Sequence, residues 1–255
     1  MSNRSSIYEG PFEVTRTEYF NTDYPSIAHY FRKPSFFQDL IERDRFVIFG
    51  TRGTGKTMIL KSIYLPVYLE LLKRDGVDPK NQKHKFIGIY IPCDNLEFRR
   101  YFDVKYTKYF DHDEDKAKIL WKRYFEHYFA LYVVDNIFST LWNYGQEIDS
   151  EIKERLNKLV SLILEIYDPA GALKTKSKNF VELRSFLNQE RQRFLDFVDK
   201  KIRGFKEEFN IIKGLNFIKD ICNLLGENID SLKDIRFYLL LDDFFRHSYH
   251  LNNRN

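Results

Sequence analysis

The chain has 255 residues, a formal net charge of +4 and 17% aromatic residues, but only 11 glycines and 7 prolines. The nearly balanced charge argues against a dedicated nucleic-acid-binding tail, and the composition excludes disordered, collagen-like and low-complexity chains. The N-terminus lacks the apolar core of a signal peptide, and the apolar runs are too short to span a bilayer. Cys93 and Cys222 are the two cysteines, as suits a reducing compartment. We therefore expect a cytoplasmic protein that does not enter a membrane.

The first part of the chain predicts two strands that flank a helix. After one or two short helices within residues 25–44, residues 45–49 form an apolar, β-branched run typical of a strand buried on both faces. Residues 56–74 carry apolar side chains at helical spacing, although Pro66 should kink or break this helix. Residues 86–91 have the pattern of a second buried strand. The order strand, helix, strand predicts an α/β fold with a parallel sheet.

The apolar pattern between about Asn95 and Asp234 follows the helical period and contains no further strand signal. Helices are expected over residues 115–142, 152–166, 180–203 and 211–225. Residues 237–241 then restore the pattern of a buried strand. We therefore divide the chain into three parts: 1–95 with leader helices and the first two strands, 96–234 as a helical insertion, and 235–255 with the last strand and a short tail.

One motif lies between the first predicted strand and the helix that follows. It reads G-T-R-G-T-G-K-T and matches G-x-x-x-x-G-K-[ST], the pattern of a P-loop. Glycines let the backbone N–H groups wrap around phosphates, and the start of the following helix adds a partial positive charge. Lys56 is suited to the β- and γ-phosphates, and the Thr57 hydroxyl is suited to Mg²⁺. The predicted nucleotide-binding residues are Gly50, Thr51, Arg52, Gly53, Thr54, Gly55, Lys56 and Thr57.

A second acidic site is expected at the end of the last strand. A P-loop site needs a carboxylate that orients the metal shell, and Asp242 directly follows the apolar run 237–241. The next residue in many ATPases of this kind is Glu, which polarises the attacking water, whereas this chain has the shorter Asp243. We therefore assign Lys56, Asp242 and Asp243 as catalytic candidates, and Thr57 and Asp242 as metal ligands.

The sequences FVIF before the loop, GIYIPCD and FYLLLDD together resemble the core of P-loop ATPases. The form RGTGKT in particular resembles origin-recognition-type AAA+ ATPases and their bacterial relatives, some of which serve in phage-defence modules. The resemblance covers the leader through about Asn95 and then residues 237–245. It implies a P-loop NTPase parallel sheet, with ATP and Mg²⁺ as cofactors and ATP hydrolysis as the activity.

Two features depart from that family pattern. The interval between Lys56 and Asp242 is several times what a minimal core requires, so we expect a large all-helical insertion. The sequence also ends soon after Asp242, before two further core strands, a sensor, an arginine finger or a lid. Either the chain is truncated after the Walker B strand, which leaves the sheet incomplete, or that strand pairs directly with the P-loop strand as in P-loop kinases and GTPases. We favour truncation.

These features favour an ATPase that acts as a nucleotide-dependent switch, in which γ-phosphate contacts alter the packing of the helical insertion. Hydrolysis is expected to be weak. A non-hydrolysing nucleotide-binding interaction module is the alternative, and a P-loop kinase is disfavoured because no arginine-rich lid pattern is present. A GTPase would carry Asn-Lys-x-Asp, and the nearest match, residues 157–160, lacks the Asp.

Other candidate sites have weaker patterns. The aromatic residues between Trp121 and Trp142 have helical spacing, which favours a core or a partner-helix face over a surface that binds bases. We expect part of this face to stay exposed and to mediate self-association or the binding of a protein partner. His247 and His250 are interpreted as part of an unpatterned tail rather than as metal ligands.

Overall fold

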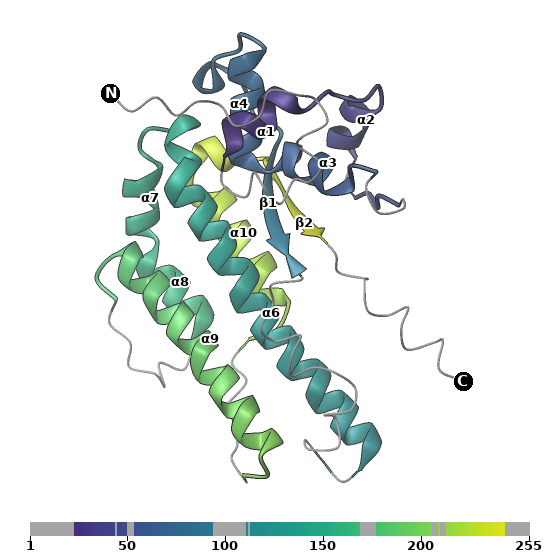
Figure 1. Cartoon of the computed structure of the whole chain (residues 1–255). Helices are drawn as coiled ribbons and strands as arrows, with labels where there is room; N and C mark the ends of the chain where they lie inside the picture. Colours follow the sequence, from purple (N-terminus) through teal and green to yellow (C-terminus); the bar gives the residue numbers. More distant parts are fainter. Residues whose placement is uncertain are drawn as a thin grey trace, which may run out of the picture.

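The computed structural model describes residues 23–43, 45–49, 54–93, 111, 113–168, 177–205, 209 and 213–242. In this part of the chain, a small parallel sheet has short N-terminal helices on one side and long helices on the other (Figure 1). The protein is therefore α/β in class, as expected, but mostly helical.

The sheet consists of β1 (Phe86–Pro92) and β2 (Arg236–Asp242), which confirms two of the three predicted strands. The strands are parallel, and their register pairs Phe86 with Arg236 and Pro92 with Asp242. Because strand side chains alternate, even-numbered residues of both strands share one face and odd-numbered residues share the other. The even face packs against the N-terminal helices, and the odd face packs against the long helices.

The predicted strand at residues 45–49 is absent, which corrects the first expectation. No described residue forms a strand ladder with this segment, and β2 pairs with β1. Val47 and Phe49 are 65% and 87% exposed, whereas the Phe46 ring packs edge-on against Tyr238 at 6.0 Å. The segment thus has the alternation of a strand but lacks the hydrogen-bonded neighbour that a strand requires. Direct pairing of the Walker B strand with the P-loop strand is therefore wrong for the described residues.

The leader forms two helices, α1 (Tyr24–Tyr30) and α2 (Phe37–Glu42), as predicted. Asp23 caps α1 by accepting a hydrogen bond from the Ser26 amide at 3.1 Å. The hydroxyl of Tyr238 on β2 donates to the backbone oxygen of Ile41 in α2 at 3.0 Å, and Arg236 donates to that of Glu42 at 3.0 Å. These contacts anchor the end of α2 to β2.

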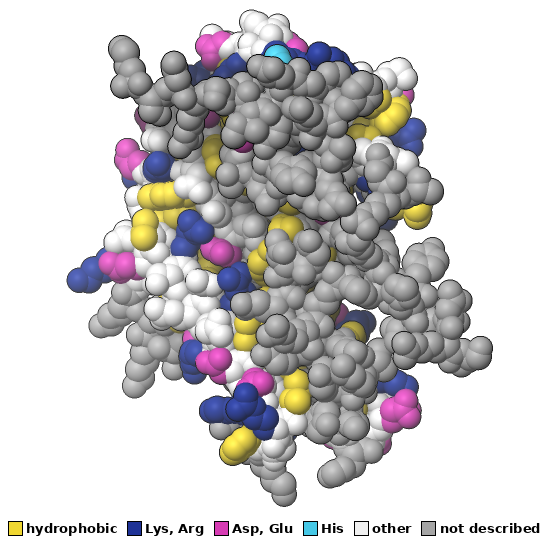
Figure 2. All heavy atoms as spheres, viewed as in Figure 1, with side chains coloured by type: hydrophobic (Ala, Val, Ile, Leu, Met, Phe, Trp, Pro, Cys, Tyr) yellow, Lys and Arg dark blue, Asp and Glu magenta, His cyan; other side chains and the backbone are white. Residues whose placement is uncertain are grey.

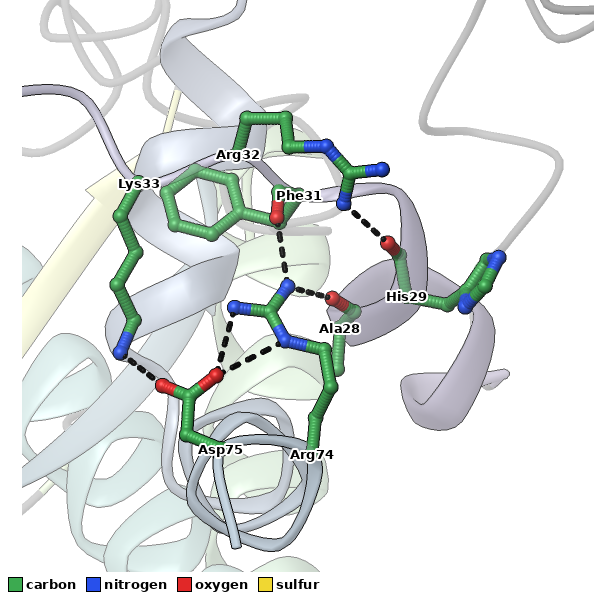
Figure 3. A network of polar contacts seen from close by, with 7 residues as sticks. All are labelled: Ala28, His29, Phe31, Arg32, Lys33, Arg74 and Asp75. Atoms are coloured by element: carbon green, nitrogen blue, oxygen red, sulfur yellow. Dashed lines mark hydrogen bonds and ion pairs between the residues drawn. The ribbon is translucent and has the colours of Figure 1, made fainter.

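Arg74, at the end of α4 (Leu65–Arg74), fixes the other leader helix (Figure 3). Its Nη1 donates to the backbone oxygens of Ala28 and Phe31, at 2.7 and 2.8 Å, where α1 ends. Its Nε donates to Asp75 Oδ1 at 3.1 Å, and the other oxygen of Asp75 accepts from Lys33 at 2.5 Å. The guanidinium thus satisfies terminal carbonyls of α1 that the helix itself leaves unpaired.

The helix predicted over residues 56–74 is broken, as Pro66 suggested. It consists of α3 (Lys56–Ile63) and α4, with Tyr64 between them in extended conformation at φ −59° and ψ 130°. Pro66 lies in the first turn of α4, where its missing N–H leaves no hydrogen bond unmade. The short 3₁₀ helix η2 (Pro79–Asn81) then leads to β1.

The long helices occupy the stretch of chain between β1 and β2, and all four expected helical segments are confirmed. The predicted helix at 152–166 is divided at Leu159, and the last helix begins and ends slightly later than expected. The elements are α6 (Glu114–Tyr144), η5 (Gly145–Glu147), α7 (Ile152–Lys158), α8 (Val160–Tyr167), α9 (Phe180–Ile202), α10 (Asn216–Asn228) and η6 (Asp230–Leu232). Among the described residues, no helix combines the length and apolar character that crossing a membrane requires.

The aromatic side chains of α6 lie in the core. Tyr124, Tyr128 and Phe138 are buried, and Trp121 and Trp142 pack half-buried against the same core. α9 and α10 cover most of this face, while Trp121, Phe125, Tyr132 and Trp142 stay partly exposed, so its role in association stays a prediction. On the face seen in Figure 2, the hydrophobic side chains of the described residues form only small separate patches among both kinds of charge.

Candidate functional site

The second half of the P-loop motif forms the start of α3. Gly55 is the N-cap and has φ 81°, a left-handed conformation that side chains disfavour, and α3 begins at Lys56. Lys56 and Thr57 are half-buried in the first turn, and Thr54 is exposed before it. Gly50, Thr51, Arg52 and Gly53 lie outside the described residues.

The first turn of α3 suits an anion. Its N-cap is a glycine, which has no side chain to accept hydrogen bonds from the backbone N–H groups, and the turn contains no acidic residue. A helix N-terminus carries partial positive charge, so phosphate oxygens are stabilised there. The local structure thus agrees with the phosphate-binding role that the motif predicts.

The direction of α3 relative to the sheet follows from two contacts. Near its C-terminal end, the Ile63 carbonyl lies against Gly88 in the first half of β1. Two residues earlier, the Lys61 ammonium lies 5.7 Å from the ring centre of Tyr90, which is closer to the end of β1. The helix therefore runs antiparallel to the strands. Its N-terminus, with Lys56 and Thr57, points toward the edge at which both strands end.

Asp242 is the last residue of β2 and lies at that edge. Its side chain is half-buried, and its Oδ2 accepts a hydrogen bond of 2.6 Å from the Tyr90 hydroxyl. Asp243 lies outside the described residues, as do His247 and His250. The structure thus brings the start of α3 and the acid at the end of β2 to one end of the sheet.

Sequence reasoning missed two residues of this site, Tyr90 and Lys61. The Lys61 side chain is only 7% exposed and lies on the even face of the sheet. Tyr90 could have been found once β1 and β2 were paired in register, because it then shares a face with Asp242 two positions along. In the sequence, Tyr90 lies within the apolar run GIYIP and therefore looks like an ordinary strand residue.

Behind this site, three tyrosines from distant parts of the chain meet. Tyr64 follows α3 directly, Tyr24 belongs to α1, and Tyr144 is the last residue of α6. The rings meet edge to face, with centroids 5.7 Å apart for Tyr24 and Tyr64 and 5.6 Å apart for Tyr24 and Tyr144. We call Tyr24, Tyr64 and Tyr144 the tyrosine cluster.

The tyrosine cluster is neutral at physiological pH. Burial is the largest cause that raises the pKa of Tyr64, and burial followed by the neighbouring Tyr24 hydroxyl raises the pKa of Tyr144 to about 12. The rings of α1, the end of α3 and the end of α6 therefore meet without charge repulsion.

A comparison with protein-family models matches residues 10–244 to the description ORC-CDC6-like. The chain belongs to the ORC-CDC6-like family. This membership confirms the origin-recognition or AAA+-like relationship that the motifs suggested, and it indicates a nucleotide-binding domain of the AAA+ type. Comparisons with curated proteins and with solved structures gave no match. The matched range includes both strands and the helices from α6 to α10, so the ORC-CDC6-like match is not limited to the motif residues.

The described residues fit a nucleotide and Mg²⁺. The ORC-CDC6-like chain presents the N-terminus of α3 toward the edge of the sheet that carries the Asp242 carboxylate. Where the structure describes the chain, no three or more His, Cys, Asp or Glu side chains come together as a metal cage. Mg²⁺ usually binds through one or two protein oxygens together with substrate phosphates, and the Asp242 carboxylate offers such an oxygen.

Proposed function

We propose that this ORC-CDC6-like chain is a P-loop ATPase that binds Mg²⁺ATP between the start of α3 and the end of β2. The antiparallel direction of α3 and β1 carries this proposal, since it turns the first turn of α3, with Lys56 and Thr57, toward the sheet edge that carries Asp242. The motif from Gly50 to Thr57 supplies the backbone N–H groups, and the family supports an AAA+ nucleotide site.

Each polar side chain has one role in this proposal. Lys56 contacts the β- and γ-phosphates as a mobile positive charge, and Thr57 and Asp242 hold the metal. Asp243 polarises the attacking water, with less reach than the Glu usual at such a position. The metal, when bound, would neutralise charge that develops on the phosphate oxygens.

Calorimetry with Lys56→Ala tests nucleotide binding. Loss of a charge-assisted phosphate contact should weaken ATP binding about 10-fold to 150-fold, equivalent to about 1.5 to 3 kcal/mol. Lys80→Ala removes a lysine from the exposed helix η2 and serves as the matched control, with affinity expected to stay at the wild-type value. Equal ATP affinity in wild type and Lys56→Ala would remove the basis of the proposal. A preference for GTP over ATP would show that the nucleotide was assigned wrongly.

We further propose that the bound nucleotide acts as a switch on the helices between β1 and β2, with residues 96–234 as the responding unit. Tyr64 supports this route, because it directly follows α3 and its ring contacts Tyr24, which in turn contacts Tyr144 at the end of α6. A shift of α3 on nucleotide binding would first move Tyr64. The end of α6 would then respond through Tyr24 and Tyr144.

Hydrogen exchange of the last turns of α6 measures this response. We expect exchange there to differ between the ATP-bound and nucleotide-free protein, and Tyr64→Leu to reduce the difference because it removes the ring that contacts Tyr24. Tyr68→Leu, which removes a half-buried ring from α4, should leave the difference unchanged. Identical exchange with and without ATP, in a protein that binds ATP, would favour the alternative in which the nucleotide only stabilises an interaction module.

A further inference from the structure

The contact between Tyr90 and Asp242 joins the two strands at the proposed metal edge. The register pairs Tyr90 with Leu240 and Asp242 with Pro92, so Tyr90 and Asp242 are diagonal neighbours on the even face. The Tyr90 hydroxyl donates to Asp242 Oδ2 at 2.6 Å, which is short and suits a charge-assisted bond to a carboxylate. Both side chains are half-buried, so water competes less for this bond than it would at an exposed site.

The Tyr90 ring is itself held in place. The Lys61 ammonium lies 5.7 Å from its centre, and the Tyr64 ring lies 6.0 Å away with an interplanar angle of 42°. Lys61 comes from α3, and Tyr64 directly follows that helix. A tyrosine has only two side-chain torsions between its backbone and its ring, so a ring packed in this way presents its hydroxyl in one direction.

The hydrogen bond has a consequence for the carboxylate. A free Asp side chain can rotate about its terminal bond and exchange its two oxygens, whereas a bond to Oδ2 fixes that rotation. The bond from Tyr90 engages Oδ2 of the Asp242 carboxylate. Among the described residues, no further hydrogen bond holds Oδ1, so the described part of the site leaves Oδ1 to a ligand.

We propose that Tyr90 is a positioning residue that fixes the Asp242 carboxylate so that Oδ1 is presented to the metal of the nucleotide complex. This inference rests on the proposed function, because it assigns Asp242 to that metal. Hydrogen-bonding partners of metal ligands orient them, and their loss costs about 10-fold to 100-fold in metal affinity in known sites. Tyr90 therefore belongs to the site although it touches neither phosphate nor metal.

The test uses Tyr90→Phe in the full chain, since it removes only the hydroxyl and keeps the ring between Lys61 and Tyr64. The probe is Mn²⁺, titrated by electron paramagnetic resonance into the protein saturated with ATP. We expect Mn²⁺ to bind about tenfold more weakly to Tyr90→Phe than to the wild type. ATP affinity measured without divalent ions should be unchanged, because the loop residues are intact. Thermal unfolding by circular dichroism confirms that the variant is folded.

Two further variants make the result specific. Tyr68→Phe removes another half-buried hydroxyl beside the sheet, from a ring that packs on Phe86 at 4.8 Å, and should leave Mn²⁺ affinity unchanged. Asp242→Asn weakens Mn²⁺ binding by itself, and adding Tyr90→Phe to it should cause no further loss, because the two changes act on one ligand.

The possible failures are distinguishable. Unchanged or tighter Mn²⁺ binding by Tyr90→Phe, in a chain whose wild type binds ATP and Mn²⁺ together, overturns the positioning role and leaves the proposed function standing. The positioning role is also wrong if the losses of Mn²⁺ affinity caused by Tyr90→Phe and by Asp242→Asn add up in the double variant. A wild type that binds no ATP overturns both proposals.

Discussion

The backbone oxygen of Ile63 lies so close to Gly88 that a Cβ atom added to Gly88 would be 2.1 Å from it. Ile63 ends α3, and Gly88 is the third residue of β1. The same approach places Tyr64 in an isolated parallel bridge with Gly88. The glycine therefore allows the P-loop helix to lie directly on the sheet. Any side chain at this position would move α3 away from the strands.

Gly88→Ala should both destabilise the protein and weaken ATP binding. The new methyl group meets a backbone carbonyl rather than a flexible side chain, so we expect a loss of about 1 to 3 kcal/mol in the free energy of unfolding. ATP affinity should fall because the start of α3 moves relative to Asp242. Urea denaturation and calorimetry measure the two effects.

The matched control for that variant is Gly226→Ala in α10. Its Cβ would lie 3.7 Å from the nearest atom, the Leu232 oxygen, which is an ordinary contact. Alanine in a helix is favoured over glycine by about 1 kcal/mol, so this variant should be neutral or slightly more stable. Equal stability of Gly88→Ala and wild type would show that α3 can move without cost.

Arg74→Ala should release the leader helix α1 from α4. The change removes donors to the backbone oxygens of Ala28 and Phe31, and we expect a loss of about 2 kcal/mol in the free energy of unfolding. Arg32, which follows the end of α1, offers a comparison, since among the described residues it donates to the His29 oxygen alone, at an exposed position (Figure 3). Arg32→Ala should therefore cost less than Arg74→Ala. Similar losses in the two variants would contradict the role given to Arg74.

The sequence was sufficient for local structure and for the motif. Periodicity located the long helices and the strands β1 and β2, and Pro66 marked the break at Tyr64. These features depend on short-range chemistry that a single chain displays directly. Residues 45–49 have the same apolar pattern as β1 but do not form a strand. Strand formation depends on a hydrogen-bonded neighbour, which the periodicity of a single segment does not reveal.

The candidate site was predictable only in part. The P-loop motif and Asp242 carry recognisable spacing, whereas Tyr90 and Lys61 reach the site through sheet register and helix direction. The tyrosine cluster joins Tyr24, Tyr64 and Tyr144 across most of the first half of the chain. Such contacts are set by tertiary packing, so no local pattern in the sequence signals them.

Protonation of His127 should contribute to acid destabilisation. The ring is 0% exposed, packs against Phe194 and Phe209, and its Nδ1 donates to the Lys213 oxygen at 2.9 Å. Burial lowers the pKa of His127 from 6.5 to about 4. The unfolded chain therefore takes up this proton first as pH falls. Stability should drop between pH 6.5 and 4, by about 3 kcal/mol from this group alone, and the contribution should be constant below that range.

The measurement compares urea denaturation of wild type and His127→Asn across this pH range. Asn can still donate to the Lys213 oxygen but does not titrate, so the variant should lose less stability between pH 6.5 and 4 than the wild type. Tyr68→Phe, which removes a group with a pKa above 10, is the control and should keep the wild-type pH dependence. Parallel curves for wild type and His127→Asn would show that His127 does not carry the effect.

The last prediction concerns Asp243, which stands where many ATPases of this kind have Glu. We expect wild-type turnover below about 1 s⁻¹, the lower end for competent enzymes, because the shorter acid reaches the attacking water less well. Asp243→Glu should raise the single-turnover rate at least about tenfold, a part of the 10²- to 10⁴-fold that a well-placed acid or base contributes. ATP affinity should not change, since this acid acts on water rather than on phosphate. Asp243→Asn is the matched control and should lower the rate further. A wild type that turns over at about 1 s⁻¹ or faster, with no gain from Asp243→Glu, would mean that a different group positions the water.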